Sequence, residues 1–142
     1  MEIAHSQDYI MLRLAHGENI LKTLEEVVAE EKASLLIATG IGMITDFELG
    51  YFENGEYVKM AFKEPHELVM LQGTVASEGE LRMHIHAVVA DKDHRAFGGH
   101  LLKGWVWVSN EIGLLRLKGV RSKRILDKDR GVAVLHVSQI LD

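Results

Sequence analysis

The sequence has no cysteine, a single proline and no excess of basic residues. Without cysteine, no disulfide can support the fold, and no thiolate can serve as a nucleophile or a metal ligand. Lys and Arg together number 16 against 21 Asp and Glu, which gives a formal net charge of −5. A surface of that sign does not concentrate polyanions, so unaided, non-specific binding of DNA is disfavoured.

Long apolar runs are also missing. The longest, around 35–38 and 135–137, are far shorter than the ~20 residues that cross a bilayer. The N-terminus lacks the basic start of a signal peptide and carries charges every few residues. We therefore expect a soluble cytoplasmic protein. Its 142 residues, 47% hydrophobic and 26% charged, fit one globular domain over 1–142.

One stretch has the spacing of an amphipathic helix. Its apolar residues recur at positions i, i+1, i+4, i+7 and i+8, and they are Ile20, Leu21, Leu24, Val27 and Val28. Gly17 ends the segment before it, and Glu18 is expected to open the helix with an acid in the first turn, where the helix dipole favours negative charge. This is the main helix that the sequence predicts.

Most of the remaining sequence has the alternating or continuous apolar pattern of strands. Glu53-Asn54-Gly55 predicts a hairpin turn, because Asn and Gly tolerate the positive φ of such turns. Gly98-Gly99 is expected to break the chain. The predicted strands are 8–15, 34–39, 47–51, 57–62, 68–75, 81–89, 101–108, 113–117 and 132–137. One helix with many strands predicts a single α+β domain whose sheet is mostly antiparallel.

The eight histidines include a candidate metal site. His84 and His86 are two residues apart, so on a strand both imidazoles lie on one face and can reach a single divalent ion. His100 is the natural third ligand, because Gly98 and Gly99 before it let the backbone approach closely. Three histidines with an open fourth position are typical of a zinc site that holds water or an external ligand.

Other interpretations of these residues stay open. A His-x-His pair is also common as half-buried or surface histidines that only form hydrogen bonds. Glu111 is a candidate general base or fourth ligand, or simply an exposed residue. The basic cluster at 118–124 could grip phosphates, although such clusters are usually solvated surface. No catalytic residue can be assigned.

Four segments together match a known family pattern. They are Gly17-Glu18-Asn19-Ile20-Leu21, Ala38-Thr39-Gly40-Ile41-Gly42, the stretch 66–74, and Gly98-Gly99-His100-Leu101 followed by Gly104. On these segments, nearly the whole chain resembles the PPC domain (plants and prokaryotes conserved), in its stand-alone prokaryotic form.

The resemblance implies an α+β domain that assembles as a homotrimer. Many prokaryotic members keep the histidines that are His84, His86 and His100 here, which implies a metal, most simply zinc. Members are commonly labelled DNA-binding. Plant members read the minor groove of AT-rich DNA through an added Arg-Gly-Arg-Pro hook, which this sequence lacks. The resemblance thus favours a trimeric, metal-binding, DNA-associated regulatory protein, and a metal-dependent enzyme of unknown substrate is the alternative.

A trimer also needs apolar surface, to which Phe47, Tyr51, Trp105 and Trp107 could contribute.

Overall fold

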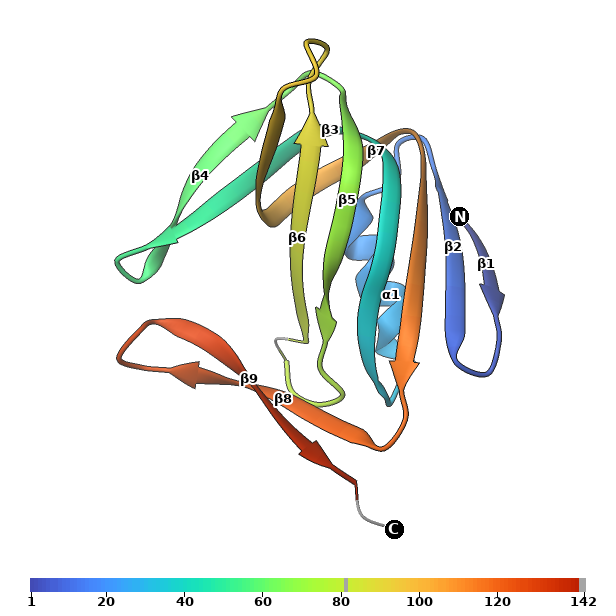
Figure 1. The fold of residues 1–142 in the computed structure, drawn as a ribbon, viewed down its shortest axis with the longest axis vertical. Helices are drawn as coiled ribbons and strands as arrows, with labels where there is room; N and C mark the ends of the chain where they lie inside the picture. The colour runs from blue at the N-terminus through green and yellow to red at the C-terminus, as the bar shows by residue number, and fades with distance from the viewer. Residues whose placement is uncertain (81, 141–142) are drawn as a thin grey trace.

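The computed structural model describes residues 1–80 and 82–140. Strands make up most of this part of the chain, and one short helix lies against them (Figure 1). The elements in order are β1 (Glu2–His5), β2 (Tyr9–Ala15), α1 (Ile20–Ala29), β3 (Ser34–Glu53), β4 (Glu56–Phe62), β5 (His66–Val75), β6 (Met83–Ala90), β7 (Ala96–Leu117), β8 (Val120–Asp127) and β9 (Val132–Gln139).

The main sheet has the strand order β1-β2-β7-β6-β5-β3-β4, and every pairing in it is antiparallel. The long strands β3 and β7 also pair with each other, so β3, β5, β6 and β7 form a closed ring. Register shifts along the β3–β7 pairing bend both strands and make this closure possible. Strands β8 and β9 form a separate hairpin that faces the β3–β4 hairpin (Figure 1).

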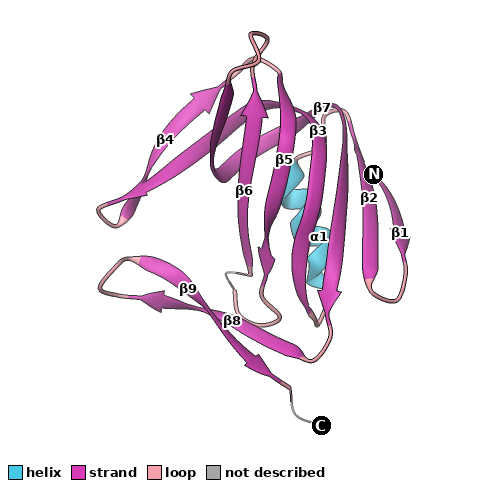
Figure 2. Ribbon diagram, in the orientation of Figure 1, coloured by secondary structure: helices cyan, strands magenta, loops and turns pink. Residues whose placement is uncertain are grey.

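The predicted apolar stripe of the helix is confirmed, and the helix is the cyan element of Figure 2. Ile20, Leu24 and Val28 are buried in the core. The helix begins at Ile20, so the prediction that Glu18 opens it is wrong. Asn19 caps it instead, since its side chain accepts a hydrogen bond from the Lys22 amide. Glu18 lies just before the cap and accepts a hydrogen bond from the Ala15 amide at 2.7 Å.

The hairpin prediction at Asn54-Gly55 is confirmed, and both residues have positive φ, 50° and 89°. The predicted break at Gly98-Gly99 is wrong, because β7 runs without interruption through both glycines. They serve close packing instead: a Cβ on Gly99 would lie 2.9 Å from the Gly50 carbonyl oxygen. Likewise, 34–39 and 47–51 are two parts of the single strand β3.

The α+β description holds only in a coarse form, because the ten-residue α1 is a minor part of a mostly antiparallel β structure. The strand predicted over 81–89 is found from Met83 onward, and Leu81 lies outside the described residues. Phe47 is fully buried in the core, so the expectation that it contributes to a subunit contact is wrong. Across 1–80 and 82–140, no helix is long and apolar enough to span a bilayer.

Candidate metal centre

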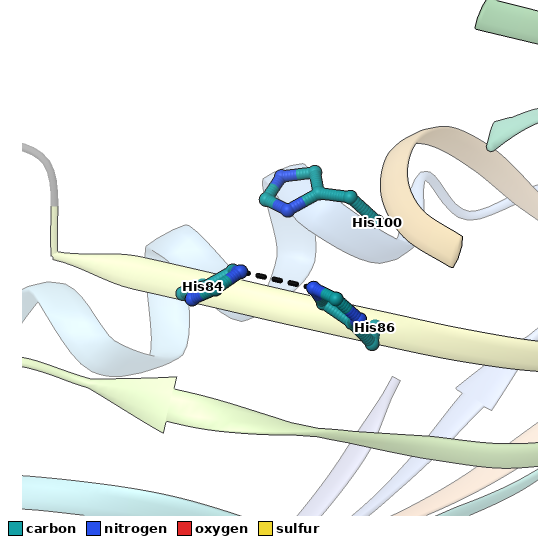
Figure 3. Close-up of side chains that lie close together, drawn as sticks. All are labelled: His84, His86 and His100. Atoms are coloured by element: carbon teal, nitrogen blue, oxygen red, sulfur yellow. Dashed lines mark hydrogen bonds between the residues drawn. The ribbon is translucent and has the colours of Figure 1, made fainter. Parts of the chain in front are cut away.

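The structure brings together the three histidines that the sequence singled out. The ligand atoms of His84, His86 and His100 all lie within 4.8 Å of one another. The Nε2 atoms of His84 and His86 are 3.0 Å apart, the contact drawn as a dashed line in Figure 3. His84 and His100 are half-buried and His86 is exposed, so the cluster reaches the surface of the molecule rather than lying in its core.

Strand pairing explains this convergence. His86 and His100 are direct partners across the β6–β7 pairing, and His84 lies two residues from His86 on the same face. On the other side of β6, Gly73 of β5 pairs with Ile85. A Cβ on Gly73 would lie 2.2 Å from the His84 carbonyl oxygen, so glycine is required there for β5 to approach. Backbone pairing on both sides therefore fixes the position of β6.

Tyr57 of β4 orients the third imidazole. Its hydroxyl is hydrogen-bonded to His100 Nδ1 at 3.2 Å, and the two rings lie 4.6 Å apart at a tilt of 34°. Since Nδ1 is occupied by this contact, Nε2 is the His100 atom left for a metal. Metal-binding histidines usually have such a partner on their other nitrogen, because it fixes the tautomer and the ring orientation.

The surroundings favour the neutral form of His84 and His100. Burial, with smaller effects from nearby His84, His86 and the Arg124 guanidinium, lowers the pKa of His100 to about 4. Burial followed by Arg124 and His86 also lowers the pKa of His84. Neutral imidazole is the form that binds a metal, so the lowered pKa values of His84 and His100 favour metal binding at these two residues.

The donor set fits a zinc-type ion. Zinc bound by three nitrogens at 2.0–2.1 Å in tetrahedral geometry needs them about 3.4 Å apart. The His84–His86 distance of 3.0 Å is close to this value, and all the ligand atoms lie within 4.8 Å of one another. No cysteine is available in the chain, so a metal here would have imidazole ligands with oxygen ligands at most completing the set.

The other candidate residues lie elsewhere. Glu111 is exposed and pairs in register with Arg13 on β2, outside the histidine group. The basic cluster at 118–124 does not form one patch: Lys118, before β8, and Arg121, on it, form ion pairs with Asp8 and Glu78. Arg124 points instead into the hollow next to the histidines.

Sequence reasoning missed Tyr57 and the role of Arg124. Both come from hairpins that are distant in sequence from the histidines, and neither forms a motif with them. The one sequence signal that bears on Tyr57 is the hairpin turn at Asn54-Gly55, which pairs β4 with β3. Because β3 also pairs with β7, the turn brings β4 near the strand that carries His100.

Comparison with known proteins identifies the family. Residues 1–118 match the model of the Plants and Prokaryotes Conserved (PCC) domain. The chain belongs to this family. It is the family that the sequence resemblance named as the PPC domain, and that prediction is confirmed. Strands β8 and β9 lie beyond the matched residues.

Solved structures share the PPC fold over almost the whole chain. A plant- and prokaryote-conserved protein from Pyrococcus horikoshii is 28% identical with a TM-score of 0.81, over 95% of this chain and 93% of that one. The metal-containing protein AF0104 from Archaeoglobus fulgidus is 29% identical with a TM-score of 0.79, over 94% and 95% of the two chains. A chain from Bacteroides thetaiotaomicron, described as a candidate DNA-binding protein, is 24% identical with a TM-score of 0.85, over 95% and 96%.

Among curated proteins, Bifunctional protein GlmU from Synechococcus sp. (strain JA-3-3Ab) is 26% identical over 133 residues. These residues are 92% of this chain but only 21% of that protein. The PPC chain thus spans about a fifth of the length of the curated relatives it matches.

Proposed function

We propose that this PPC-domain protein binds zinc on His84, His86 and His100 and that the bound ion has a functional rather than a purely structural role. The observation that carries the proposal is the convergence of three imidazoles within 4.8 Å, one of them oriented by Tyr57. The description of the Archaeoglobus fulgidus relative as metal-containing supports it.

The ligand chemistry favours zinc over the harder divalent ions. Calcium and magnesium prefer carboxylate and carbonyl oxygens, whereas zinc is well suited to imidazole nitrogen. Copper and nickel also bind imidazole, so the metal analysis below must identify the element.

Three protein ligands leave the fourth zinc position open. A zinc ion bound in this way supplies a Lewis acid that polarises a carbonyl or activates water. The alternative function is therefore a metal-dependent enzyme of unknown substrate. A hollow of about 290 Å³ lined by His84 and His100 favours this alternative, because it gives a small molecule access to the site. A structural zinc site, in contrast, is usually closed by four protein ligands.

Metal analysis of protein purified without an affinity tag tests the proposal. Wild type should carry about one zinc per chain, and the double variant His84→Ala/His86→Ala should carry none. His94→Ala is the matched control, because His94 is exposed and lies outside the cluster. Equal metal content in wild type and the double variant would show that the site does not exist. Unfolding of wild type on chelation would show that the metal is structural.

We also propose that the protein is a homotrimer. Strands β3 and β4 carry exposed apolar side chains, with Tyr51 72%, Val58 56% and Met60 61% exposed. Trp107 on β7 is 40% exposed. The β3–β4 side chains adjoin one another, since Tyr51, Val58 and Met60 line one shallow hollow, and an exposed apolar patch of this kind usually marks an interface. Light scattering on the eluted protein should give three times the chain mass of 15.9 kDa, and a monomeric mass would contradict the proposal.

DNA association is the second candidate function, supported by the description of the Bacteroides thetaiotaomicron relative. The chain carries a net charge of −5 and lacks the Arg-Gly-Arg-Pro hook, so we expect weak binding without preference for AT-rich duplex. Fluorescence anisotropy with AT-rich and GC-rich duplexes of equal length, at near-physiological salt, measures this. Clear preference for the AT-rich duplex would make DNA the primary partner.

A further inference from the structure

Arg124 on β8 has unusual surroundings for an arginine of this protein. It is half-buried, and its guanidinium donates to Thr74 Oγ1 at 2.5 Å and, through a longer contact of 3.4 Å, to the Arg82 carbonyl oxygen. Thr74 is the register partner of His84 on the neighbouring strand β5. Arg124 therefore lies directly beside the three-histidine cluster.

No described carboxylate neutralises this guanidinium. Five other arginines form ion pairs with Asp or Glu, namely Arg13, Arg95, Arg116, Arg121 and Arg130. Arg82 is held by three backbone carbonyl oxygens. Within residues 1–80 and 82–140, Arg124 has neither a carboxylate partner nor a set of three backbone carbonyl partners. Burial penalises its charged form and so lowers its pKa. An anion beside it would offset that cost.

Arg124 lines the hollow of about 290 Å³ that also contains His84 and His100. The hollow lies between the β3–β4 and β8–β9 hairpins, whose turns meet: a Cβ on Gly131 would lie 3.2 Å from the Gly55 carbonyl oxygen. This approach of the two turns is visible in Figure 1, where they face each other on the left.

The lining has one polar side and several apolar walls. Tyr57, Arg124 and the two histidines supply the polar side, and Glu56 is an exposed carboxylate that also borders the hollow. The apolar walls come from both hairpins and from β6, through Phe52, Leu126, Val132 and Met83. A ligand that fits this lining has one charged end and an apolar body.

We propose that this hollow binds an organic carboxylate with an apolar body, whose carboxylate group is held by Arg124 next to the three-histidine site. The inference deepens the proposed function, on which it rests for the metal at the adjacent wall. A single guanidinium with a tyrosine hydroxyl nearby suits the planar, bidentate carboxylate. A phosphate usually requires several cations or a cluster of backbone amides, and the lining instead offers apolar side chains.

Calorimetric titration with benzoate and with hexanoate tests the proposal on zinc-loaded and on metal-free protein. Benzamide and hexanamide serve as neutral ligands of nearly the same shape. The variants are Arg124→Met and Arg124→Lys. The control is Arg121→Met on the same strand, whose side chain is exposed and paired with Glu78 outside the hollow. Zinc content and melting temperature are recorded for every protein, so that a misfolded variant is recognised.

At least one of the two carboxylates should bind wild type and Arg121→Met alike. The Kd of that carboxylate for Arg124→Met should be at least about tenfold higher than for wild type, because a charge-assisted pair is lost. The Kd for Arg124→Lys should lie between these two values. The two amides should bind wild type no more tightly than the carboxylates bind Arg124→Met. If wild type proves not to take up zinc but still binds a carboxylate in an Arg124-dependent way, the carboxylate site is supported and the metal proposal fails.

Three results would overturn the inference. The first is that neither carboxylate binds at about 10 mM, a concentration that detects even weak sites. The second is binding that does not change in a folded Arg124→Met variant. The third is binding of inorganic phosphate that depends on Arg124 while both carboxylates fail, which would assign the hollow to phosphate.

Discussion

Removing the hydroxyl of Tyr57 tests whether the proposed metal centre depends on its surroundings as the geometry implies. Tyr57→Phe keeps the aromatic ring, which lies 4.6 Å from the His100 imidazole. It deletes only the oxygen that is 3.2 Å from His100 Nδ1. The Nδ1–H that would then have no partner is half-buried, so the ring loses both its fixed tautomer and part of its fixed orientation.

The size of the effect follows from what such partners contribute in other metal sites. Loss of a hydrogen bond to a ligating histidine typically weakens metal binding about 10- to 100-fold. At about 1.4 kcal/mol per tenfold change, this is about 1.4 to 2.8 kcal/mol of binding free energy. Because Phe preserves the ring contact with His100, the fold and the proposed zinc ligands should be unchanged, and the loss should appear in the zinc Kd alone.

Competition with a chromophoric chelator measures the zinc Kd of wild type, Tyr57→Phe and the control Tyr51→Phe. Tyr51 is 72% exposed on β3, and its hydroxyl is not near the histidines, so the control should bind like wild type. A Tyr57→Phe Kd within about twofold of wild type would refute the argument that Tyr57 orients His100. An equal loss in both variants would show an effect unrelated to the site.

Two further predictions concern β5, which supports the site, and the ion pair between Glu31, just beyond α1, and Arg116 of β7. Gly73→Ala places a Cβ 2.2 Å from the His84 carbonyl oxygen, so it should destabilise the fold by about 3 kcal/mol in urea unfolding and weaken zinc binding. Gly98→Ala, whose Cβ would meet nothing closer than 3.4 Å, should cost less than about 1 kcal/mol. Glu31 accepts hydrogen bonds from Arg116 at 2.7 and 2.9 Å, which lower its pKa below 4.5. Glu31→Gln should therefore cost about 2 kcal/mol at neutral pH, and the difference from wild type should shrink as the pH falls through the lowered pKa. A difference that is the same at pH 7 and pH 3 would contradict this.

Local sequence signals were sufficient where one segment determines its own structure. The helical stripe from Ile20 to Val28 and the turn at Asn54-Gly55 were found because their spacing and their φ preference are local properties. The same reasoning failed at Gly98-Gly99, where glycine serves the approach of Gly50 from β3 rather than a break. Which of the two roles a glycine pair has depends on a strand about 50 residues away, and the sequence pattern carries no sign of it.

The candidate site divides in the same way. His84 and His86 could be paired from their spacing on one strand, and His100 from the glycines before it. Tyr57 and Arg124 could not be found, because their positions follow from how two hairpins meet. Arg124 in particular belongs to a run of basic residues in which Lys118 and Arg121 form surface ion pairs, so its charge was assigned to solvent.

This difference in predictability matches a difference in structural support. The histidines lie on β6 and β7, which are paired inside the closed ring of strands, where backbone pairing fixes side-chain positions. Tyr57 and Arg124 lie on hairpins whose turns touch near Gly55 and Gly131. Metal ligands require positions fixed to a fraction of an ångström, whereas ligand selection is more easily changed on hairpins and loops. If the hollow binds a carboxylate as proposed, we therefore expect substitutions in β8 and β9, which lie beyond the residues that match the family model, to change which ligand it accepts.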